Sequence, residues 1–397
     1  MEQNLIRKLC SKYYKDMVTL RHHFHMYPEI GFKEFKTSQK IKEELKKMNV
    51  DSIENLAETG VVALIKGKYP GKTLLIRGDM DALLIDEETD LEYKSKIPGV
   101  MHACGHDGHI AALLGTAMVL NEIKDELHGN IKLVFQPAEE GEGGAKRMIE
   151  EGVLENPKVD GAIACHLWGQ VPEGHIELKE GALMASCDDF KIIIKGKGGH
   201  GSTPHLCINP IDISMQVINN IKSFISSKID PFKPIVLSFG AINGGESCNI
   251  IPSKVEIKGT LRTFDDSIKE YIKNSIKEIL DYTTKFYGGS YEIEFLSFAP
   301  TVINDKSMIS LAKKTLENMY GKDKILQCKK PYTGSEDFAF FTNKVSSIML
   351  LVGIKKDLEI LHHNSEFKWD DKNLFTACET LTSIAINFLN SYFNELE

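Results

Sequence analysis

The sequence lacks any run of about 18 or more apolar residues, so it offers no candidate for a membrane-spanning helix. Its N-terminal segment is charged throughout and has no apolar signal-peptide core, from which we expect a cytoplasmic location. Internal repeats and low-complexity segments are also missing. No basic face is evident, and the net charge is −8 with a pI near 6.0, so the composition argues against nucleic-acid binding.

Paired cysteine spacing is absent as well. The eight cysteines are scattered along the chain, at positions 10, 104, 165, 187, 207, 248, 328 and 378. In a reducing compartment this pattern predicts free, mostly buried thiols. Cys104 alone lies among other metal-binding residue types, so it is the one cysteine that we take as a functional candidate.

The chain is long enough for two domains. It has 397 residues, of which 42% are hydrophobic and 26% charged, as in a soluble globular protein. Apolar strands alternate with helices over residues 1–186 and again over 300–397, which predicts an α/β catalytic domain with a largely parallel sheet flanked by helices. Residues 187–299 follow the order β-α-β-β-α-β of a ferredoxin-like domain. We therefore expect the catalytic domain to be interrupted by a small α+β lid or dimerisation domain.

Residues 102–109 read HACGHDGH, which places a thiol, three imidazoles and a carboxylate in one short loop. Gly105 and Gly108 allow this loop to turn tightly. Thiolate and imidazole together suit zinc, and imidazole also suits other transition metals. The simpler alternative is a surface turn with one buried cysteine, but five ligand-capable side chains in eight residues favour a metal site. An apolar helix over 109–123 is expected to start directly after the loop.

Further metal-binding residue types follow other predicted strands. They are Glu139 and Glu140 after strand 129–137, His166 at the end of strand 160–167, and His362 and His363 after strand 347–354. Because sites in open α/β sheets form outside the carboxyl ends of strands, we expect these groups to meet Cys104 and His106. Taken alone, each has a simpler interpretation as an exposed acidic loop or a packed core histidine. Four loops that each offer a ligand favour a common site.

Two aspartates and three residues of the inserted domain are weaker candidates. Asp81 is expected to orient a ligating histidine rather than to bind metal, and Asp79 stays open between these two roles. His200 and Asn249 lie in glycine-rich turns, and Arg262 lies near the end of a strand. Polar turns are a fair alternative for each of them. The functional interpretation is that the inserted domain acts as a lid, whose His200 and Asn249 hold substrate oxygens.

Several motifs together give the chain a family resemblance. They are GDMDALLIDE, HACGHDGH, FQPAEEGEGG, HLWG, GGHGSTPH, NIIP, TGSEDF and a late HHN. With them the sequence resembles the aminoacylase/carboxypeptidase metallohydrolases, peptidase family M20. Within this family it is similar to the branch of hippurate hydrolases, auxin-conjugate (IAA-amino acid) hydrolases and N-acetyldiaminopimelate deacetylases. The resemblance covers residues 22–371, and HACGHDGH followed by PAEEG is its most specific part.

The resemblance implies roles for individual residues. The metal-ligand positions fall on Cys104, His106, Glu140, His166 and His363, and the general-base position falls on Glu139. His362 and His363 are locally ambiguous, but relatives place an aromatic residue four positions after the ligand, so Phe367 selects His363. The proline that is common shortly after this histidine is absent here. His200 corresponds to a lid histidine that polarises the scissile carbonyl, in some relatives from the partner subunit.

The implied activity is hydrolysis of the amide bond of N-acyl-L-amino acids, such as acetyl or benzoyl conjugates, to a carboxylic acid and a free amino acid. Glu139 would assist attack by a water that bridges two divalent ions, Mn²⁺ or Zn²⁺, with Co²⁺ and Ni²⁺ as further options. Asn249 and Arg262 are candidates for holding the amino acid carboxylate. His102, Asp107 and His109 are left with loop-shaping or orienting roles.

Two other functions stay open at this point. A dipeptidase or carboxypeptidase would use the same two-metal site. A non-catalytic ligand-binding homologue is disfavoured, because the base and all five ligand positions are filled. The resemblance also suggests a homodimer or homotetramer formed through the lid domain, where strand 234–242 and helix 210–228 are candidate interfaces.

Overall fold

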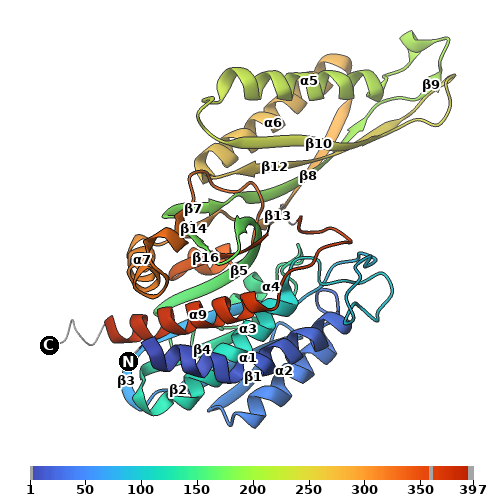
Figure 1. Cartoon of the computed structure of the whole chain (residues 1–397). Coiled ribbons are helices and arrows are strands. Elements are labelled where there is room, and N and C mark those ends of the chain that lie inside the picture. Colours follow the sequence, from blue (N-terminus) through green and yellow to red (C-terminus); the bar gives the residue numbers. More distant parts are fainter. Residues whose placement is uncertain (1–2, 357–360, 392–397) are drawn as a thin grey trace. The chain divides into compact units, whose positions relative to one another are not determined.

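The computed structural model of the chain describes residues 3–356 and 361–391 (Figure 1). It divides into two compact units. Unit 1 comprises Met1–Leu183, Val302–Pro331 and Asp337–Glu397, and unit 2 comprises Met184–Thr301 and Tyr332–Glu336. The short stretch Tyr332–Glu336, which the sequence does not set apart from the second catalytic segment, thus belongs to unit 2.

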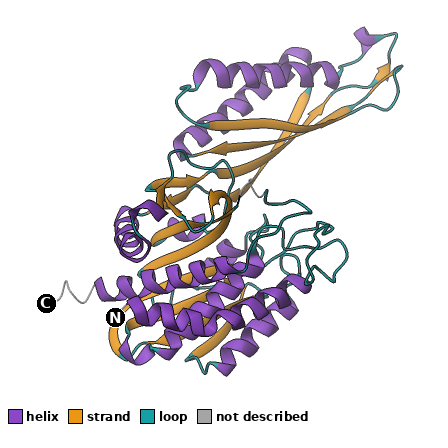
Figure 2. Cartoon of the chain, in the orientation of Figure 1, coloured by secondary structure: helices purple, strands orange, loops and turns teal. Residues whose placement is uncertain are grey.

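Unit 1 contains most of the helices and strands (Figure 2). Its helices are α1 (Gln3–Met26), α2 (Phe35–Lys47), α3 (His106–Glu122), α4 (Gly144–Glu150), α7 (Lys306–Tyr320), α8 (Ala339–Thr342) and α9 (Lys372–Ser391). Its strands are β1 (Ser52–Leu56), β2 (Gly60–Lys66), β3 (Tyr69–Asp79), β4 (His128–Gln136), β5 (Gly161–Pro172), β6 (Ile176–Leu178), β7 (Gly181–Met184), β14 (Val302–Asn304), β15 (Ile325–Gln327) and β16 (Ser346–Lys355).

The main sheet of unit 1 has eight strands in the order β1-β2-β4-β3-β5-β16-β6-β15. Its centre, β4-β3-β5-β16, is parallel, whereas β1 and β2 are antiparallel on one side and β6 is antiparallel to β16 on the other. The expected α/β class with a largely parallel central sheet is confirmed. Because the four central strands run in one direction, the loops after them meet at one edge of the sheet.

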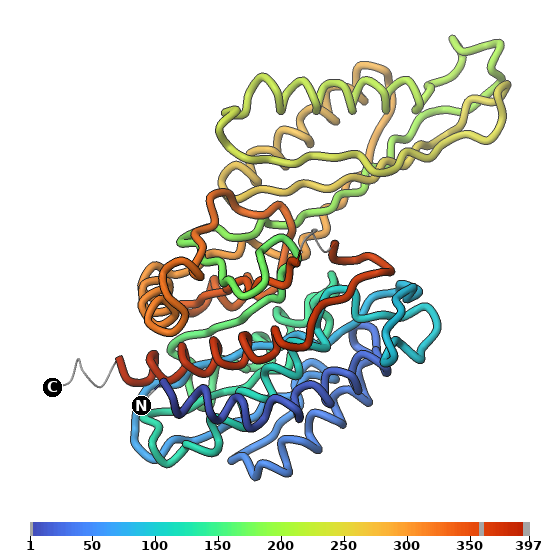
Figure 3. Tube along the Cα trace, viewed as in Figure 1, coloured from blue at the N-terminus to red at the C-terminus, as the bar shows by residue number. Residues whose placement is uncertain are grey.

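Three helices form one layer of unit 1. α1, α3 and α9 pack against one another, and α9 also contacts the central strands. The traces in Figures 1 and 3 show α1 and α9 side by side, and residues of both helices belong to one core. α3 is apolar on nearly all sides and is buried accordingly. A rigid helix therefore carries the second half of the HACGHDGH motif.

Unit 2 has its own core and sheet. Its elements are β8 (Ser186–Lys195), β9 (Gly199–His200), α5 (Pro210–Lys228), β10 (Ile235–Asn243), β11 (Ile250–Ile251), β12 (Lys254–Thr263), α6 (Asp266–Tyr287) and β13 (Ser290–Ala299). The sheet order is β10-β12-β8-β13, and every neighbouring pair is antiparallel. The side chains of Asn209 and Asp265 cap α5 and α6 by accepting backbone N–H bonds. This is the split β-α-β-β-α-β arrangement expected from the sequence.

Two expected boundaries near the site were wrong. α3 begins at His106, inside the HACGHDGH motif and not after it. β5 continues to Pro172, so His166 lies within this strand and not at its end.

The prediction of free cysteines is confirmed, and Cys248 is the exposed one among them. Within residues 3–356 and 361–391, no helix is both long enough and apolar enough to cross a membrane.

Candidate metal centre

Gly105 turns the HACGHDGH motif into helix α3. It takes a left-handed conformation, with φ of 88°, directly before His106 begins the helix. Gly108 lies in the first turn, where a Cβ atom would come within 2.4 Å of the Trp369 ring, so only glycine fits. The helix starts earlier than expected because Gly105 supplies this left-handed residue. Cys104 thus lies in the loop, and His106 lies on the end of the helix.

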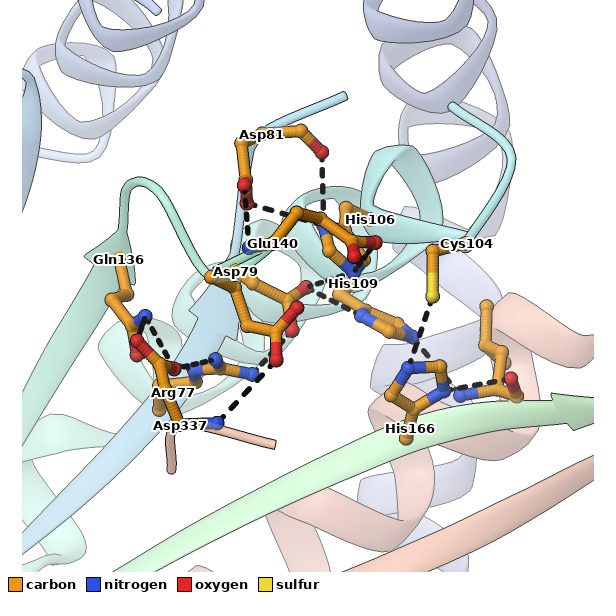
Figure 4. A network of polar contacts seen from close by, with 12 residues as sticks. Arg77, Asp79, Asp81, Cys104, His106, His109, Gln136, Glu140, His166 and Asp337 are labelled. Carbon is orange, nitrogen blue, oxygen red and sulfur yellow. Dashed lines mark hydrogen bonds and ion pairs between the residues drawn. The ribbon is translucent and has the colours of Figure 1, made fainter. Parts of the chain in front are cut away.

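The metal-binding side chains expected from four loops lie together in unit 1. In five groups of three described residues, the possible ligand atoms lie within 4.8 Å of one another, and three of these groups consist of expected site residues: Cys104, His106 and His166; Cys104, Glu140 and His363; and His106, Glu139 and Glu140. Figure 4 shows the Cys104 sulfur pointing toward the His166 ring. The first two groups share the Cys104 thiol, so one sulfur serves two neighbouring clusters.

Hydrogen bonds determine which ring nitrogen of the two buried ligand candidates is available. Nδ1 of His106 lies 2.9 Å from the carbonyl oxygen of Asp81, and Nδ1 of His166 lies 2.9 Å from the carbonyl oxygen of Leu167. A carbonyl oxygen only accepts, so Nδ1 carries a proton in both rings, and in the neutral imidazole that a cation requires Nε2 keeps its lone pair. Nε2 of His166 lies 3.5 Å from Cys104 Sγ. Both rings are oriented by a second partner, as metal-binding imidazoles usually are.

The donor set fits two divalent cations. Nε2 of His106 is buried without a hydrogen-bond partner among the described residues, and it lies 3.9 Å from Oε1 of Glu140. Such atoms are costly unless something binds them. Burial raises the pKa of the Cys104 thiol, and burial together with neighbouring imidazoles holds the pKa of His166 well below its usual range. A divalent cation requires a neutral imidazole, which His166 offers, and its charge would stabilise the Cys104 thiolate that burial alone disfavours.

The adjacent histidines His362 and His363 have different surroundings. Nε2 of His363 lies 3.2 Å from Oε1 of Glu140, and the backbone of His363 is left-handed, with φ of 58°. Nε2 of His362 instead accepts the backbone N–H of Gly169 at 3.0 Å. Burial lowers the pKa of His362 to about 3, so its ring is neutral and its proton lies on Nδ1. That nitrogen lies 3.8 Å from Cys104 Sγ.

His109 has no free nitrogen for a metal. Its Nε2 accepts the N–H of Leu167 at 3.0 Å, so its Nδ1 carries the proton and donates to Asp79 at 2.6 Å. Asp79 is completely buried and forms an ion pair with Arg77 on the same strand (Figure 4). Burial opposes ionisation, yet Arg77 and nearby imidazoles hold the pKa of Asp79 well below its usual range. In this geometry Asp79 orients His109, which in turn holds the strand that carries His166.

Asp81 contacts two of the ligand candidates. Its Oδ2 accepts the N–H of Glu140 at 2.9 Å, and its Oδ1 lies 3.3 Å from Nδ1 of His106. One carboxylate therefore joins the loop after β4 to the start of α3. Through these contacts Asp81 can orient two of the expected ligands.

Asp337 holds a second buried network that sequence reasoning missed. Its carboxylate accepts from Gln136 Nε2 at 2.7 Å, from the N–H of Ala145 at 3.0 Å and from Arg77 at 3.1 Å. Its backbone N–H points to Oε1 of Glu139 at 3.4 Å. The available signal was Arg77 itself, because an arginine inside an apolar strand requires a carboxylate partner.

The loop that carries Glu139 and Glu140 is hydrogen-bonded to Glu34 of the N-terminal segment. Ala138 has a left-handed backbone, with φ of 54°, and its N–H donates to Oε1 of Glu34 at 2.9 Å. The hydroxyl of Thr59 donates to the other oxygen of Glu34 at 2.6 Å. Burial raises the pKa of Glu34 to about 7. Nothing in the local sequence distinguishes Glu34 from an exposed helix-end glutamate.

The other polar residues of the motif face partners in the N-terminal region. Asp107 accepts from Arg21 at 3.2 Å and lies 2.9 Å from Nδ1 of His25. Nε2 of His25 in turn lies 3.2 Å from Glu87. His102 is fully buried, and burial lowers its pKa to about 4. These contacts agree with the loop-shaping roles expected for Asp107 and His102.

His200 and Asn249 lie close together in unit 2, and both are exposed. His200 is paired with Ile250 between β9 and β11, directly next to Asn249. Nδ1 of His200 accepts the backbone N–H of Ser202 at 3.1 Å. The neutral ring therefore carries its proton on Nε2, where it can donate to an oxygen of another molecule.

Arg262 lies toward the other end of β12, where it donates to Ser335 at 2.7 Å. The eight residue steps from Lys254, at the start of β12 beside the β9–β11 pair, correspond to about 26 Å of strand. Asn249 precedes Lys254 by only five positions. Asn249 and Arg262 thus lie toward opposite ends of β12, and they stay separate candidates for holding the amino acid carboxylate.

Known proteins match this fold and this set of residues. Residues 75–387 match the model of Peptidase family M20/M25/M40. The chain is 39% identical over 381 residues to thermostable carboxypeptidase 1 of Saccharolobus solfataricus, with 94% of this chain and 95% of that protein covered. It is 40% identical over 308 residues to the N-acyl-L-amino acid amidohydrolase of Geobacillus stearothermophilus, with 77% of this chain and 83% of that protein covered.

A solved structure from Bacillus subtilis, described as a dinuclear metal binding peptidase from the M20 family, is 32% identical. Its TM-score is 0.83, and the match covers 96% of this chain and 99% of that one. The resemblance drawn from the motifs is therefore confirmed, and the chain belongs to peptidase family M20/M25/M40.

Proposed function

We propose that this protein is a metal-dependent amidohydrolase that cleaves N-acyl-L-amino acids to a carboxylic acid and a free amino acid. The observation that carries the proposal is the position of Glu139 beside two clusters of ligand atoms that share the Cys104 thiol. The assigned ligands are Cys104, His106, Glu140, His166 and His363. The name of the amidohydrolase relative from Geobacillus stearothermophilus supports the same substrate class.

The two neighbouring glutamates have different roles in this proposal: Glu140 binds metal, and Glu139 acts as the general base. Two divalent cations, when bound, lower the pKa of water and polarise an amide carbonyl. Glu140 is held toward the ligand cluster by its N–H bond to Asp81. Glu139 remains beside it as the general base, which takes the proton of the attacking water and passes it to the departing amine.

The substrate contacts come from unit 2 in this proposal. His200 carries a proton on Nε2 and donates it toward the carbonyl oxygen as negative charge develops there. Arg262 is the better partner for the amino acid carboxylate, because its guanidinium is a charged, two-pronged donor. Asn249 then serves a different polar group of the substrate, since it lies by His200.

A second candidate function is a dipeptidase or carboxypeptidase with the same site. The thermostable carboxypeptidase relative of Saccharolobus solfataricus favours this alternative by its name. Both reactions cleave an amide bond next to an amino acid carboxylate. They differ in whether the acyl part carries a free amine.

The test is a panel of acetyl- and benzoyl-amino acids and matched dipeptides, assayed with the metal-free protein before and after addition of Mn²⁺ or Zn²⁺. We expect metal-dependent release of amino acid from the N-acyl compounds, with lower kcat/KM on the dipeptides. The opposite preference would select the peptidase. No metal-dependent turnover of either class would contradict the proposed function.

We also propose Mn²⁺ or Zn²⁺ as the native cations, with Co²⁺ or Ni²⁺ as replacements, because thiolate and imidazole ligands suit these ions. A cytoplasmic location is proposed from the free cysteines. A homodimer or homotetramer through unit 2 is proposed because β10 is an edge strand of its sheet.

A further inference from the structure

His362, the first histidine of the HHN motif, contacts the shared sulfur without belonging to the ligand groups. Its Nδ1 lies 3.8 Å from Cys104 Sγ, within hydrogen-bonding distance for sulfur. Because Nε2 of His362 accepts the N–H of Gly169, Nδ1 must carry the proton of the neutral ring. The proton therefore lies on the nitrogen that faces Cys104.

The ring of His362 is also held by its surroundings. Its centroid lies 4.8 Å from that of Trp168 and 5.0 Å from that of Phe367. A ring packed between two aromatic side chains and bonded at Nε2 cannot rotate to present its other nitrogen to the sulfur without losing the Gly169 bond. The tautomer and the orientation are thus determined by separate contacts.

We infer that His362 is a positioning residue that donates a hydrogen bond from Nδ1 to the Cys104 thiolate and thereby lowers the electron donation of this sulfur to the two cations. The inference rests on the proposed function, because it requires Cys104 to be a metal-bound thiolate. A hydrogen bond to a charged acceptor is stronger than a neutral one, so metal binding strengthens this contact. The two adjacent histidines then have distinct tasks: His363 binds metal and His362 adjusts the sulfur.

Bound Co²⁺ can be used to measure how strongly the Cys104 sulfur donates electrons to the metal. Co²⁺ bound to a thiolate absorbs in the near ultraviolet through charge transfer from sulfur to metal. A hydrogen bond lowers the energy of the sulfur donor electrons, so its removal shifts this band to longer wavelength. Absorbance measures the effect without any substrate.

Two amide variants distinguish the role of Nδ1 of His362 from that of Nε2. The amide nitrogen of His362→Asn stands as many bonds from Cα as Nδ1, so this variant can still donate to Cys104. The amide of His362→Gln stands at the position of Nε2, so it can accept the Gly169 N–H but offers no donor to the sulfur. His362→Phe keeps the packing against Trp168 and Phe367 and loses both bonds.

The experiment uses the full-length metal-free protein and its three variants, each titrated with Co²⁺ to saturation. We expect an unchanged number of cobalt ions per subunit in all four. The band should move to longer wavelength in His362→Gln and His362→Phe and stay near the wild-type position in His362→Asn. Loss of the Cys104 contact should also lower Co²⁺ affinity by about tenfold or more.

Two results would overturn the inference. An unchanged band in both His362→Gln and His362→Phe would mean that no hydrogen bond reaches the sulfur. A lower cobalt stoichiometry in these variants would make His362 a ligand itself. The absence of any thiolate-to-cobalt band in the wild-type protein would instead contradict the assignment of Cys104 as a ligand, and with it the proposed centre.

Discussion

The ligand cluster of unit 1 and the β9–β11 pair of unit 2 hold their functional side chains in opposite ways. In unit 1, His106 and His166 are buried, and each is oriented by a backbone carbonyl through Nδ1. In unit 2, His200 and Asn249 are exposed, and His200 is oriented by one neighbouring N–H bond. In the proposed function, this difference means that the metal site is organised before substrate arrives, whereas the donors of unit 2 are exposed to an incoming molecule.

The largest effect should come from Glu139, the proposed base. Glu139→Gln keeps the size of the side chain but cannot take a proton, so kcat should fall by about 10²–10⁴-fold. Metal content, measured by mass spectrometry, should stay at the wild-type level, because the ligands are untouched. Near-wild-type turnover of an N-acyl amino acid would remove Glu139 from the mechanism.

The next largest effect is expected from His200 in unit 2. His200→Ala removes the Nε2–H donor, and we expect kcat to fall by about 10²–10³-fold, the usual cost of losing one oxyanion donor. His205→Ala, an exposed histidine five positions later, is the matched control and should keep wild-type kinetics. Metal content should not change in either variant. If His200→Ala lost metal instead, His200 would contribute to metal binding, and the contrast between the ligand cluster of unit 1 and the β9–β11 pair of unit 2 would be wrong.

A smaller effect should come from the supports of the metal site. His109→Phe removes both the bond to Asp79 and the bond to the Leu167 N–H, so metal affinity should fall by about 10–100-fold. Thr116→Val is the control, since it lies on the same helix and its hydroxyl bonds only to the preceding turn. Competition with a chelator measures both variants. Equal affinities would mean that the orienting bonds of unit 1 contribute nothing.

The smallest effect concerns the pH dependence of stability through Glu34, which supports the loop that carries Glu139. Burial raises the pKa of Glu34 from 4.5 to about 7, so the folded state binds this proton more tightly than the unfolded chain does. The resulting stability is present below about pH 4.5 and is lost as pH rises through 7. Between pH 5 and 7.5 the wild-type free energy of unfolding should therefore lose roughly 1–2 kcal/mol that Glu34→Gln does not lose.

Urea unfolding of the metal-free proteins at the two pH values measures this loss. Glu44→Gln is the control: burial raises the pKa of Glu44, but its partners Lys40 and Lys47 outweigh burial and lower it overall. The stability that Glu44 supplies is therefore lost only at lower pH. A Glu34→Gln variant with the same pH slope as the wild type would exclude an ionisable role for Glu34 in this range.

Much of the fold and of the site could be predicted, because both depend on local patterns. Alternating apolar strands and helices indicated the α/β unit, and β-α-β-β-α-β order indicated unit 2. The ligand types could be found because few other side chains bind metals and because parallel strands bring their following loops together. Cys104, His106, His166 and the pair Glu139 and Glu140 could be named as candidates for these reasons, and the family resemblance then separated the two glutamates.

Residue type alone could not separate the proposed histidine ligands from the other histidines, and only the family resemblance selected His363 over His362 and gave His109 an orienting role. His109 and His362 have the same chemistry as the ligands, and they are set apart only by the N–H groups of Leu167 and Gly169, which come from a distant strand. The supports Asp337 and Glu34 lie far from the motif in the sequence and meet it only in the fold. Local patterns also misplaced the start of α3, because one left-handed glycine decided it.

The number of metal ions per subunit tests the central claim most directly. Both ligand groups use the Cys104 sulfur, so Cys104→Ala should disturb both cations at once. Mass spectrometry of the metal-saturated proteins should give two ions per subunit in the wild type and fewer than one in Cys104→Ala. A variant that still holds two ions would contradict a centre built on a shared thiolate.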